Sequence, residues 1–292
     1  MFQILYVFIV AFLFTQQSEY ALARRKWDKI EPQITKFYPG AHYILLTFND
    51  DALSAETTYG RDESGNGVII SVLDTLKHFK ARATFFVQGS MVEKYPEIIK
   101  RMVRDRHEVA NLGWQTSFIT DNAAKANVLA AQGGFKGESL TPHTAPSTAP
   151  DGSPANEELL HQIKRTDDML LKVSGKSSTL YRPPYALQSN TARGGTAASY
   201  YIPQLADLVH SHSSHQVILW SSVAPGYGEA GGDAAVVEKT VLSKAKKGDV
   251  VLLHITPATA AALGPILSHL MQQGFEMLTI SEMLSFPDEK PH

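Results

Sequence analysis

The 292-residue chain contains no cysteine, and this absence narrows the chemistry that it can carry. Disulfide scaffolds, thiolate zinc sites, iron–sulfur clusters and a cysteine nucleophile are all excluded. Any metal must therefore be held by histidine and carboxylate side chains.

The chain also lacks an excess of charge of either sign. It has 27 Lys and Arg against 29 Asp and Glu, a formal net charge of −2 and a pI of about 6.6. Nucleic acids and polybasic membrane-surface contacts both need clustered Lys and Arg, so the composition predicts neither kind of partner. At this length, 43% of hydrophobic residues is enough to build one large core.

A long apolar run occurs only at the N-terminus. Residues 1–14 read MFQILYVFIVAFLF without a charge, and Ala21-Leu22-Ala23 follows before two arginines. The run is shorter than the roughly 20 residues that span a bilayer and is followed by an A-x-A motif, which is typical of a secretory signal peptide over residues 1–23. The alternative is an uncleaved anchor. No other segment predicts a span, so we expect a secreted or cell-envelope protein without a stable membrane span after cleavage.

Beyond residue 40, short apolar runs alternate with amphipathic segments. This alternation predicts an α/β fold with parallel strands and right-handed crossovers. The number of βα units favours a (β/α) barrel over an open sheet, with functional groups at the C-terminal ends of the strands. Strands are expected at 43–48, 83–87, 107–110, 179–181, 216–220 and 249–253, and helices at 68–79, 95–105, 156–173, 234–246 and 260–274.

One segment interrupts this alternation. Residues 122–154 are rich in Ala, Gly, Ser, Thr and Pro, which predicts a low-complexity surface insertion inside one domain rather than a linker between two. We therefore divide the chain after the signal peptide into an N-terminal extension at 24–41, one domain at 42–286 that contains the insertion, and a tail at 287–292.

Several ordered motifs of the chain resemble the NodB-type polysaccharide deacetylases, which are the family 4 carbohydrate esterases. They are the run at 67–114, Arg-Pro-Pro-Tyr at 182–185, Lys-Gly-Asp-Val-Val-Leu-Leu-His at 247–254 and Gly-Phe-Glu-Met-Leu-Thr-Ile at 274–280. The resemblance implies a single distorted (β/α) barrel, in agreement with the pattern of strands and helices. It also implies removal of acetyl groups from N-acetylglucosamine polymers such as chitin, with one divalent metal, commonly zinc.

The family's first motif, Thr-Phe-Asp-Asp-Gly, supplies a catalytic base and then a metal ligand. Residues 47–51 of this chain read Thr-Phe-Asn-Asp-Asp. Asn49 therefore stands at the base position and Asp50 at the metal-ligand position. An amide has no accessible basic site near neutral pH, so the resemblance implies that the base is missing.

The family's second motif supplies two histidines, spaced i and i+4, that bind the same metal. This chain has Leu112 and Thr116 at those positions. A leucine has no lone pair, and a neutral hydroxyl is a poor ligand for zinc. Since only Asp50 remains of three ligands, we expect zinc to be bound weakly or lost.

The remaining motifs are retained in part. Arg182 would orient the base, His254 stands at the position of the general acid, and the backbone N–H of Tyr185 would contribute to an oxyanion site. Tyr185, Trp220 and Trp114 are the aromatic side chains that we assign to substrate binding. The acidic residues that follow Trp220 in the family are absent, so His254 lacks the charged environment that tunes the family's acid.

Each of these features also has a purely structural interpretation. Asp50 and Asp51 can begin a turn, His254 can be a satisfied barrel histidine, and Arg182 can hold a rigid loop. The aromatic side chains can be packing at the rim.

Three further histidines, His210, His212 and His215, have a spacing that suggests a replacement metal site. They precede the strand expected at 216–220, at the end of the barrel opposite the functional loops. We therefore interpret them as part of a polar loop.

Two hypotheses of function follow. The first is a secreted, monomeric member of the deacetylase family that retains an N-acetylglucosamine-binding groove but hydrolyses weakly or not at all. The second is an active metal-dependent N-deacetylase with a remodelled site, in which Asp50 or Asp51 takes over as the base. The combined loss of the base, both histidines and the later acids favours the first. A glycosidase is disfavoured, because no second carboxylate is expected at a strand end to pair with Asp50.

Overall fold

The computed structural model describes residues 33–34, 42–50, 58–59, 67–114, 155–183, 198–225 and 232–285. The predicted signal peptide, the insertion at 122–154 and the tail lie outside the described residues, as do Asp51, Thr116 and Tyr185. No helix among the described residues is long and apolar enough to cross a membrane.

The strands form one curled parallel sheet, and this confirms the predicted α/β fold class. Its order is β1-β6-β5-β4-β3-β2-β8-β7, with β9 paired to β2 off this path, and every pairing is parallel. Among the described strand residues, no pairing joins β7 to β1, so the barrel is open on that side. The strands are β1 (Gln33–Ile34), β2 (Tyr43–Asn49), β3 (Thr84–Val87), β4 (Glu108–Asn111), β5 (Leu180–Tyr181), β6 (Gln216–Ile218), β7 (Ser222–Val223), β8 (Val250–His254) and β9 (Glu276–Met277).

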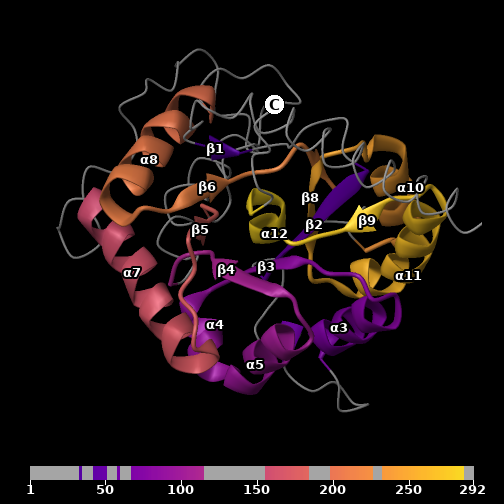
Figure 1. Cartoon of the computed structure of the whole chain (residues 1–292), viewed down its shortest axis with the longest axis horizontal. Coiled ribbons are helices and arrows are strands. Elements are labelled where there is room, and N and C mark those ends of the chain that lie inside the picture. Colours follow the sequence, from indigo (N-terminus) through magenta and orange to yellow (C-terminus); the bar gives the residue numbers. More distant parts are fainter. Residues whose placement is uncertain are drawn as a thin grey trace, which may run out of the picture.

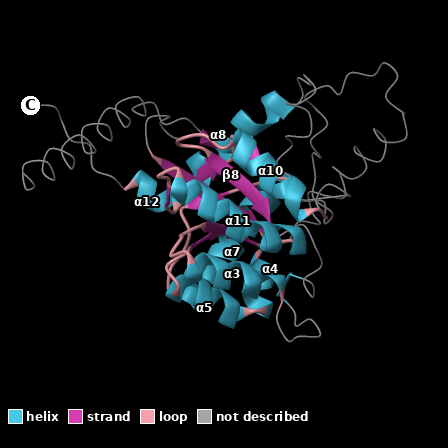
Figure 2. Ribbon diagram, turned by 90° about the vertical axis from the view of Figure 1, so that its right-hand side faces the viewer, coloured by secondary structure: helices cyan, strands magenta, loops and turns pink. Residues whose placement is uncertain are grey.

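Helices surround the outside of this sheet, as Figure 1 shows, and Figure 2 shows several of them as a layer over the strands. The five expected helices are present with small shifts at their ends, and α4, α8 and α12 were not anticipated. The helices are α3 (Val68–His78), α4 (Gly89–Lys94), α5 (Pro96–Arg104), α7 (Ala155–Ser174), α8 (Ala198–Ser213), α10 (Ala234–Lys244), α11 (Pro257–Gln272) and α12 (Ile280–Leu284).

The presence of α8 corrects one expectation. His210 and His212 are exposed side chains on the last turn of this helix, not part of a loop. Ala206 and Val209 are buried one turn apart on the same helix, and this apolar contact keeps the segment helical. His215 follows the helix and is buried.

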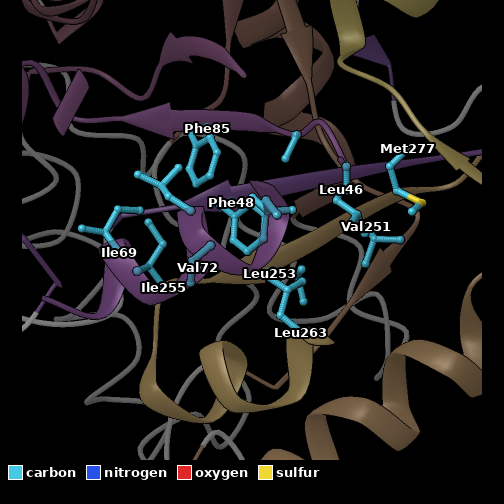
Figure 3. Close-up of a cluster of buried hydrophobic side chains, with 14 of the residues drawn as sticks. Leu46, Phe48, Ile69, Val72, Phe85, Val251, Leu253, Ile255, Leu263 and Met277 are labelled. Carbon is cyan, nitrogen blue, oxygen red and sulfur yellow. The ribbon is translucent and has the colours of Figure 1, made fainter. Parts of the chain in front are cut away.

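Side chains of β2 alternate between two hydrophobic cores. Leu46 and Phe48 point to the helices, where the Phe48 ring stacks on Phe85 with the ring centroids 4.9 Å apart (Figure 3). Leu45 belongs to a second core that the curled sheet encloses. Since side chains alternate along a strand, Thr47 and Asn49 share the inner side with Leu45. The strand therefore delivers its last polar residue into the barrel interior.

Helix α12 closes the end of the barrel at which the strands begin, and Figure 1 shows it inside the ring of strands. Ile280 and Met283 pack into the inner core. The backbone N–H of Ile280 donates to the Thr84 hydroxyl over 3.0 Å, and the same hydroxyl donates to Glu108 over 2.7 Å. An ion pair between Arg82 and Glu282 lies beside them. The opposite end is thus left for the functional groups.

The buried His107, just before β4, leads us to expect that the free energy of unfolding falls in acid. Its ring is 5% exposed, and burial lowers its pKa to about 4. The folded state therefore keeps this imidazole neutral, whereas the unfolded chain binds a proton below its ordinary value of 6.5. This contribution to stability is complete above pH 6.5 and is lost as the pH falls toward 4, by about 3 kcal/mol in total.

Urea unfolding of His107→Leu across this pH range should show a shallower acid loss than the wild type. The exposed His269→Gln on α11 is the control and should retain the wild-type slope. An equal slope in the wild type and His107→Leu would contradict this assignment.

Candidate functional site

The C-terminal ends of three strands bring the sequence-predicted residues together. Asn49 ends β2 and is in register with His254, which ends β8. Arg182 directly follows β5, and its guanidinium reaches Asn49. The structure thus places the three residues assigned to the base, the acid and the orienting positions at one edge of the sheet.

Arg182 is completely buried, and its guanidinium is held by neutral oxygens on two other strands. Nη1 donates to the Thr47 hydroxyl over 2.9 Å and to Asn49 Oδ1 over 3.0 Å. Nε and Nη2 each donate over 3.0 Å to the carbonyl oxygens of Ile218 and Leu219. A buried guanidinium needs such acceptors, because an unsatisfied charge in the interior is costly.

Aromatic rings complete the surroundings of this cation. The Arg182 guanidinium carbon lies 3.9 Å from the centre of the Phe86 ring and 5.5 Å from that of Trp220. Trp220 is only partly buried and borders the inner core. Of the two described aromatic residues assigned to substrate, Trp220 has its ring beside the Arg182 guanidinium.

Trp114 packs against α7. Its ring is 7% exposed, with the Arg165 guanidinium 3.5 Å from the ring centre. A Cβ at Gly89 would lie 2.5 Å from Trp114 Cε3, so only glycine fits there. Its predicted contact with substrate stays a prediction, as does that of Tyr185, which lies outside the described residues.

Asp50 is buried, and both of its carboxylate oxygens accept hydrogen bonds. Oδ2 accepts from the Tyr59 hydroxyl over 2.8 Å and from the Gln88 backbone N–H over 3.0 Å, and Oδ1 accepts from the Gln88 side-chain amide over 3.3 Å. Burial, followed by the nearby Asp50 carboxylate, raises the pKa of Tyr59 well above its ordinary 10.0. Tyr59 therefore stays protonated and acts as a donor to Asp50.

Leu112, at one of the family's histidine positions, is fully buried in the inner core. Its neighbours there include Phe86 and Ala110. Among the described residues, no group of three His, Asp or Glu side chains could hold a metal ion. The described side chains thus do not fit a three-ligand zinc centre, since Asp50 is engaged by donors and Leu112 offers only carbon.

A second polar network lies next to the site, and the sequence analysis missed it. Asn111 Nδ2 donates to the Ile163 carbonyl and to Asp167 Oδ1, each over 2.8 Å. Asp167 also pairs with His215 Nε2 at 3.0 Å. Burial lowers the pKa of His215, but the hydrogen bond and charge of Asp167 outweigh it, so the pKa is raised above 6.5.

This network ties α7 to the end of β4 and the start of β6. Asn111 Oδ1 in turn accepts from the backbone N–H of Gly113 over 2.7 Å, which holds the turn that carries Leu112. No motif signals the network, because its members are far apart in the chain and meet only in the folded structure.

A family model described as polysaccharide deacetylase matches residues 38–201. The chain is 29% identical over 246 residues to the peptidoglycan-N-acetylmuramic acid deacetylase PdaC of Bacillus subtilis, covering 84% of this chain and 39% of that protein. It is 28% identical over 241 residues to the peptidoglycan-N-acetylglucosamine deacetylase PgdA of Listeria monocytogenes, covering 82% of this chain and 38% of that protein. The chain thus spans less than half the length of these relatives.

Solved structures show the same fold. The structure of peptidoglycan deacetylase PdaC from Bacillus subtilis aligns with a TM-score of 0.57 at 27% identity, over 85% of this chain and 93% of that one. A structure described as a CE4 family pseudoenzyme from Bacillus anthracis aligns with a TM-score of 0.61 at 19% identity, over 90% of this chain and 72% of that one.

Two asparagines at strand ends predict opposite responses to the same substitution. Asn49 accepts from the Arg182 guanidinium, so Asn49→Asp should turn a hydrogen bond in which only the donor is charged into an ion pair and raise the free energy of unfolding by about 1 kcal/mol. Asn111 donates, so Asn111→Asp should remove two hydrogen bonds and place a second carboxylate against Asp167. This change should lower the free energy of unfolding by about 2 kcal/mol or more.

Urea unfolding at neutral pH compares the two variants. Destabilisation of both to the same extent would show that Arg182 gains nothing from a carboxylate at position 49.

Proposed function

The chain belongs to the polysaccharide deacetylase family, and we propose that it binds N-acetylglucosamine-containing glycan of the cell envelope with weak or no deacetylase activity. One observation carries this proposal. The group that Arg182 orients at the end of β2 is the amide of Asn49, which cannot take a proton from water.

Hydrolysis of an acetamide needs groups of the protein in three catalytic roles. A base must accept the proton of the attacking water, a positive group must stabilise the developing oxyanion, and an acid must protonate the departing amine. By the family resemblance, His254 would fill the third role, and the backbone N–H of Tyr185 would contribute to the second. The first has no group at its position, and its loss typically lowers the rate by about 10² to 10⁴.

The family is metal-dependent, and the described residues do not support that dependence here. A catalytic zinc site normally has three protein ligands. Asp50 already accepts hydrogen bonds from Tyr59 and Gln88, and the Leu112 side chain is part of the inner core. We therefore assign no step of a reaction to a metal.

The relatives support the choice of glycan. PdaC is named for N-acetylmuramic acid and PgdA for N-acetylglucosamine, both as deacetylases of peptidoglycan. The two sugars share the 2-acetamido group and a pyranose ring whose apolar face can stack on an aromatic side chain. We propose peptidoglycan-type strands as the ligand, with Trp220, Tyr185 and the edge near His254 as the binding surface. The predicted signal peptide is consistent with an envelope location.

Retention of the family's fold does not by itself establish activity, since the aligned Bacillus anthracis protein is described as a pseudoenzyme. The active alternative, in which Asp50 or Asp51 is the base, is likewise not established by the fold. The Asp50 carboxylate already accepts hydrogen bonds from Tyr59 and Gln88, so it is engaged within the fold.

Zinc should not stabilise the wild-type protein, because two of the three ligand positions carry Leu112 and Thr116. A ligand at 100 times its Kd adds about 2.7 kcal/mol to the free energy of unfolding, which thermal melting detects. The variant Asn49→Asp/Leu112→His/Thr116→His should show a zinc-dependent rise in melting temperature and measurable deacetylation of N-acetylglucosamine oligomers. A zinc-dependent rise in the wild type that Asp50→Ala abolishes would support the active alternative instead.

Glycan binding should be weak and should depend on the aromatic residues. We expect a Kd of about 0.1–1 mM for oligomers of three to five N-acetylglucosamine or peptidoglycan-type sugars, as stacking and a few hydrogen bonds provide. Trp220→Ala and Tyr185→Ala should each weaken binding about tenfold in an NMR titration. Leu171→Ala, on the exposed face of α7, should bind as the wild type. Failure of folded wild-type protein to bind, or unchanged binding by both aromatic variants, would reject the proposal.

A further inference from the structure

Folding gathers basic side chains at the end of the barrel opposite the candidate site. In a parallel βα architecture, all turns that lead from a helix into the next strand lie at this end. The turns after α3, α5, α7 and α10 each carry exposed Lys or Arg. Six of these side chains are Lys80, Arg106, Lys172, Lys176, Lys244 and Lys246. We call them the basic face.

None of the six forms an ion pair with another residue in the described part of the chain. The acidic groups nearby are already engaged. Asp105 pairs with Arg101 at 3.2 Å, and Glu282 pairs with Arg82. Glu108 accepts from Thr84. Asp249 and Glu276 also lie at this end, so the positive charge of the basic face rests on its six cations outnumbering these acids, although the chain as a whole has a formal net charge of −2.

Two of these residues stand where the backbone favours glycine. Lys80 has φ of 54° and Arg106 has φ of 67°, in the left-handed region just after the ends of α3 and α5. Gly274, with φ of 80°, occupies the same place after α11. A side chain there is strained relative to glycine, and Ser214 after α8, with φ of 57°, carries the same strain, so the strain by itself does not mark a cation.

Helix dipoles alone do not explain the basic face. A cation in the last turn of a helix is favoured by the dipole, as for Lys172 and Lys244, but the effect falls off beyond that turn. Lys80, Arg106, Lys176 and Lys246 lie past the ends of their helices. These four cations are therefore exposed charges that the helix dipoles do not account for.

We propose that the basic face docks on a bilayer surface rich in anionic phospholipid. The cations are spread over separate turns at one end of the barrel rather than along a groove, so they suit a planar array of phosphates better than a single extended polymer. Each Lys or Arg close to such a surface strengthens partitioning about fivefold at physiological salt. Docking in this way turns the candidate site, at the other end, away from the membrane and toward the glycan layer.

Co-sedimentation with vesicles tests this docking, with the mature form predicted to begin at Arg24. The wild type should bind vesicles of phosphatidylglycerol and phosphatidylcholine but not phosphatidylcholine alone, and binding should be lost at about 0.5 M salt. Lys80→Gly/Arg106→Gly should partition about 10- to 30-fold less while its melting temperature stays equal or rises, since glycine relieves the strain. This opposite movement of binding and stability separates docking from misfolding.

Matched variants complete the experiment. Lys176→Gln/Lys246→Gln should also bind more weakly, without any change in backbone strain. Lys164→Gln/Lys239→Gln removes two cations from the sides of α7 and α10 and should leave binding nearly unchanged. Glycan titration of all these variants should match the wild type, so this proposal and the glycan proposal fail independently.

Three results would overturn the inference. They are equal binding to neutral vesicles, unchanged binding by the Lys80 and Arg106 double variant, and binding to soluble polyphosphate but not to vesicles. The last result would identify a linear polyanion as the partner of this face.

Discussion

The buried guanidinium of Arg182 is the constraint on which the candidate site depends. It joins the end of β5 to Thr47 and Asn49 on β2 and to the carbonyl oxygens that follow β6. A cation in the interior must be surrounded by acceptors, so the three strand ends are held in one arrangement whatever chemistry takes place there. The chain meets this demand with neutral oxygens where the family places a base carboxylate. In the function proposed above, the arrangement of the strand ends is kept, while Asn49 offers no base for proton transfer.

The other substitutions are consistent with this change. Leu112 extends the inner core up to the edge of the site, and Tyr59 and Gln88 donate to the Asp50 carboxylate that a metal would otherwise share. At the motif positions the chain thus has an amide and an apolar side chain, Asn49 and Leu112, where the family motifs carry a carboxylate and a histidine. Such a site is better suited to hold a sugar ring than to activate water, because ring stacking needs apolar and aromatic surface, whereas catalysis needs groups that ionise.

Much of the fold could be predicted from local pattern, and the misses have physical reasons. The buried strand β2 and the helices α3, α5, α7, α10 and α11 have strong apolar periodicity over enough residues to be recognised. Helix α8 was missed because Pro203 interrupts its pattern, and α4 and α12 because they are too short to show one. Within the site, Asn49, Asp50, Leu112 and His254 could be identified from motifs. The donors to Asp50 and the pair between Asp167 and His215 could not, because nothing in their local sequence marks them.

The sequence by itself determined the fold class, the family and the residue types at the motif positions, since these depend on local periodicity and on the order of residues along the chain. Only the tertiary structure decided how those residues are used. It placed Trp220 beside Arg182 but packed Trp114 under Arg165, and it drew Asp50 into hydrogen bonds with Tyr59 and Gln88. It also separated charges that nearly cancel in the composition, because every turn from helix to strand comes to the same end of a parallel barrel. Net charge is a sum over the chain and does not depend on position, whereas a surface potential depends on where folding brings each charge.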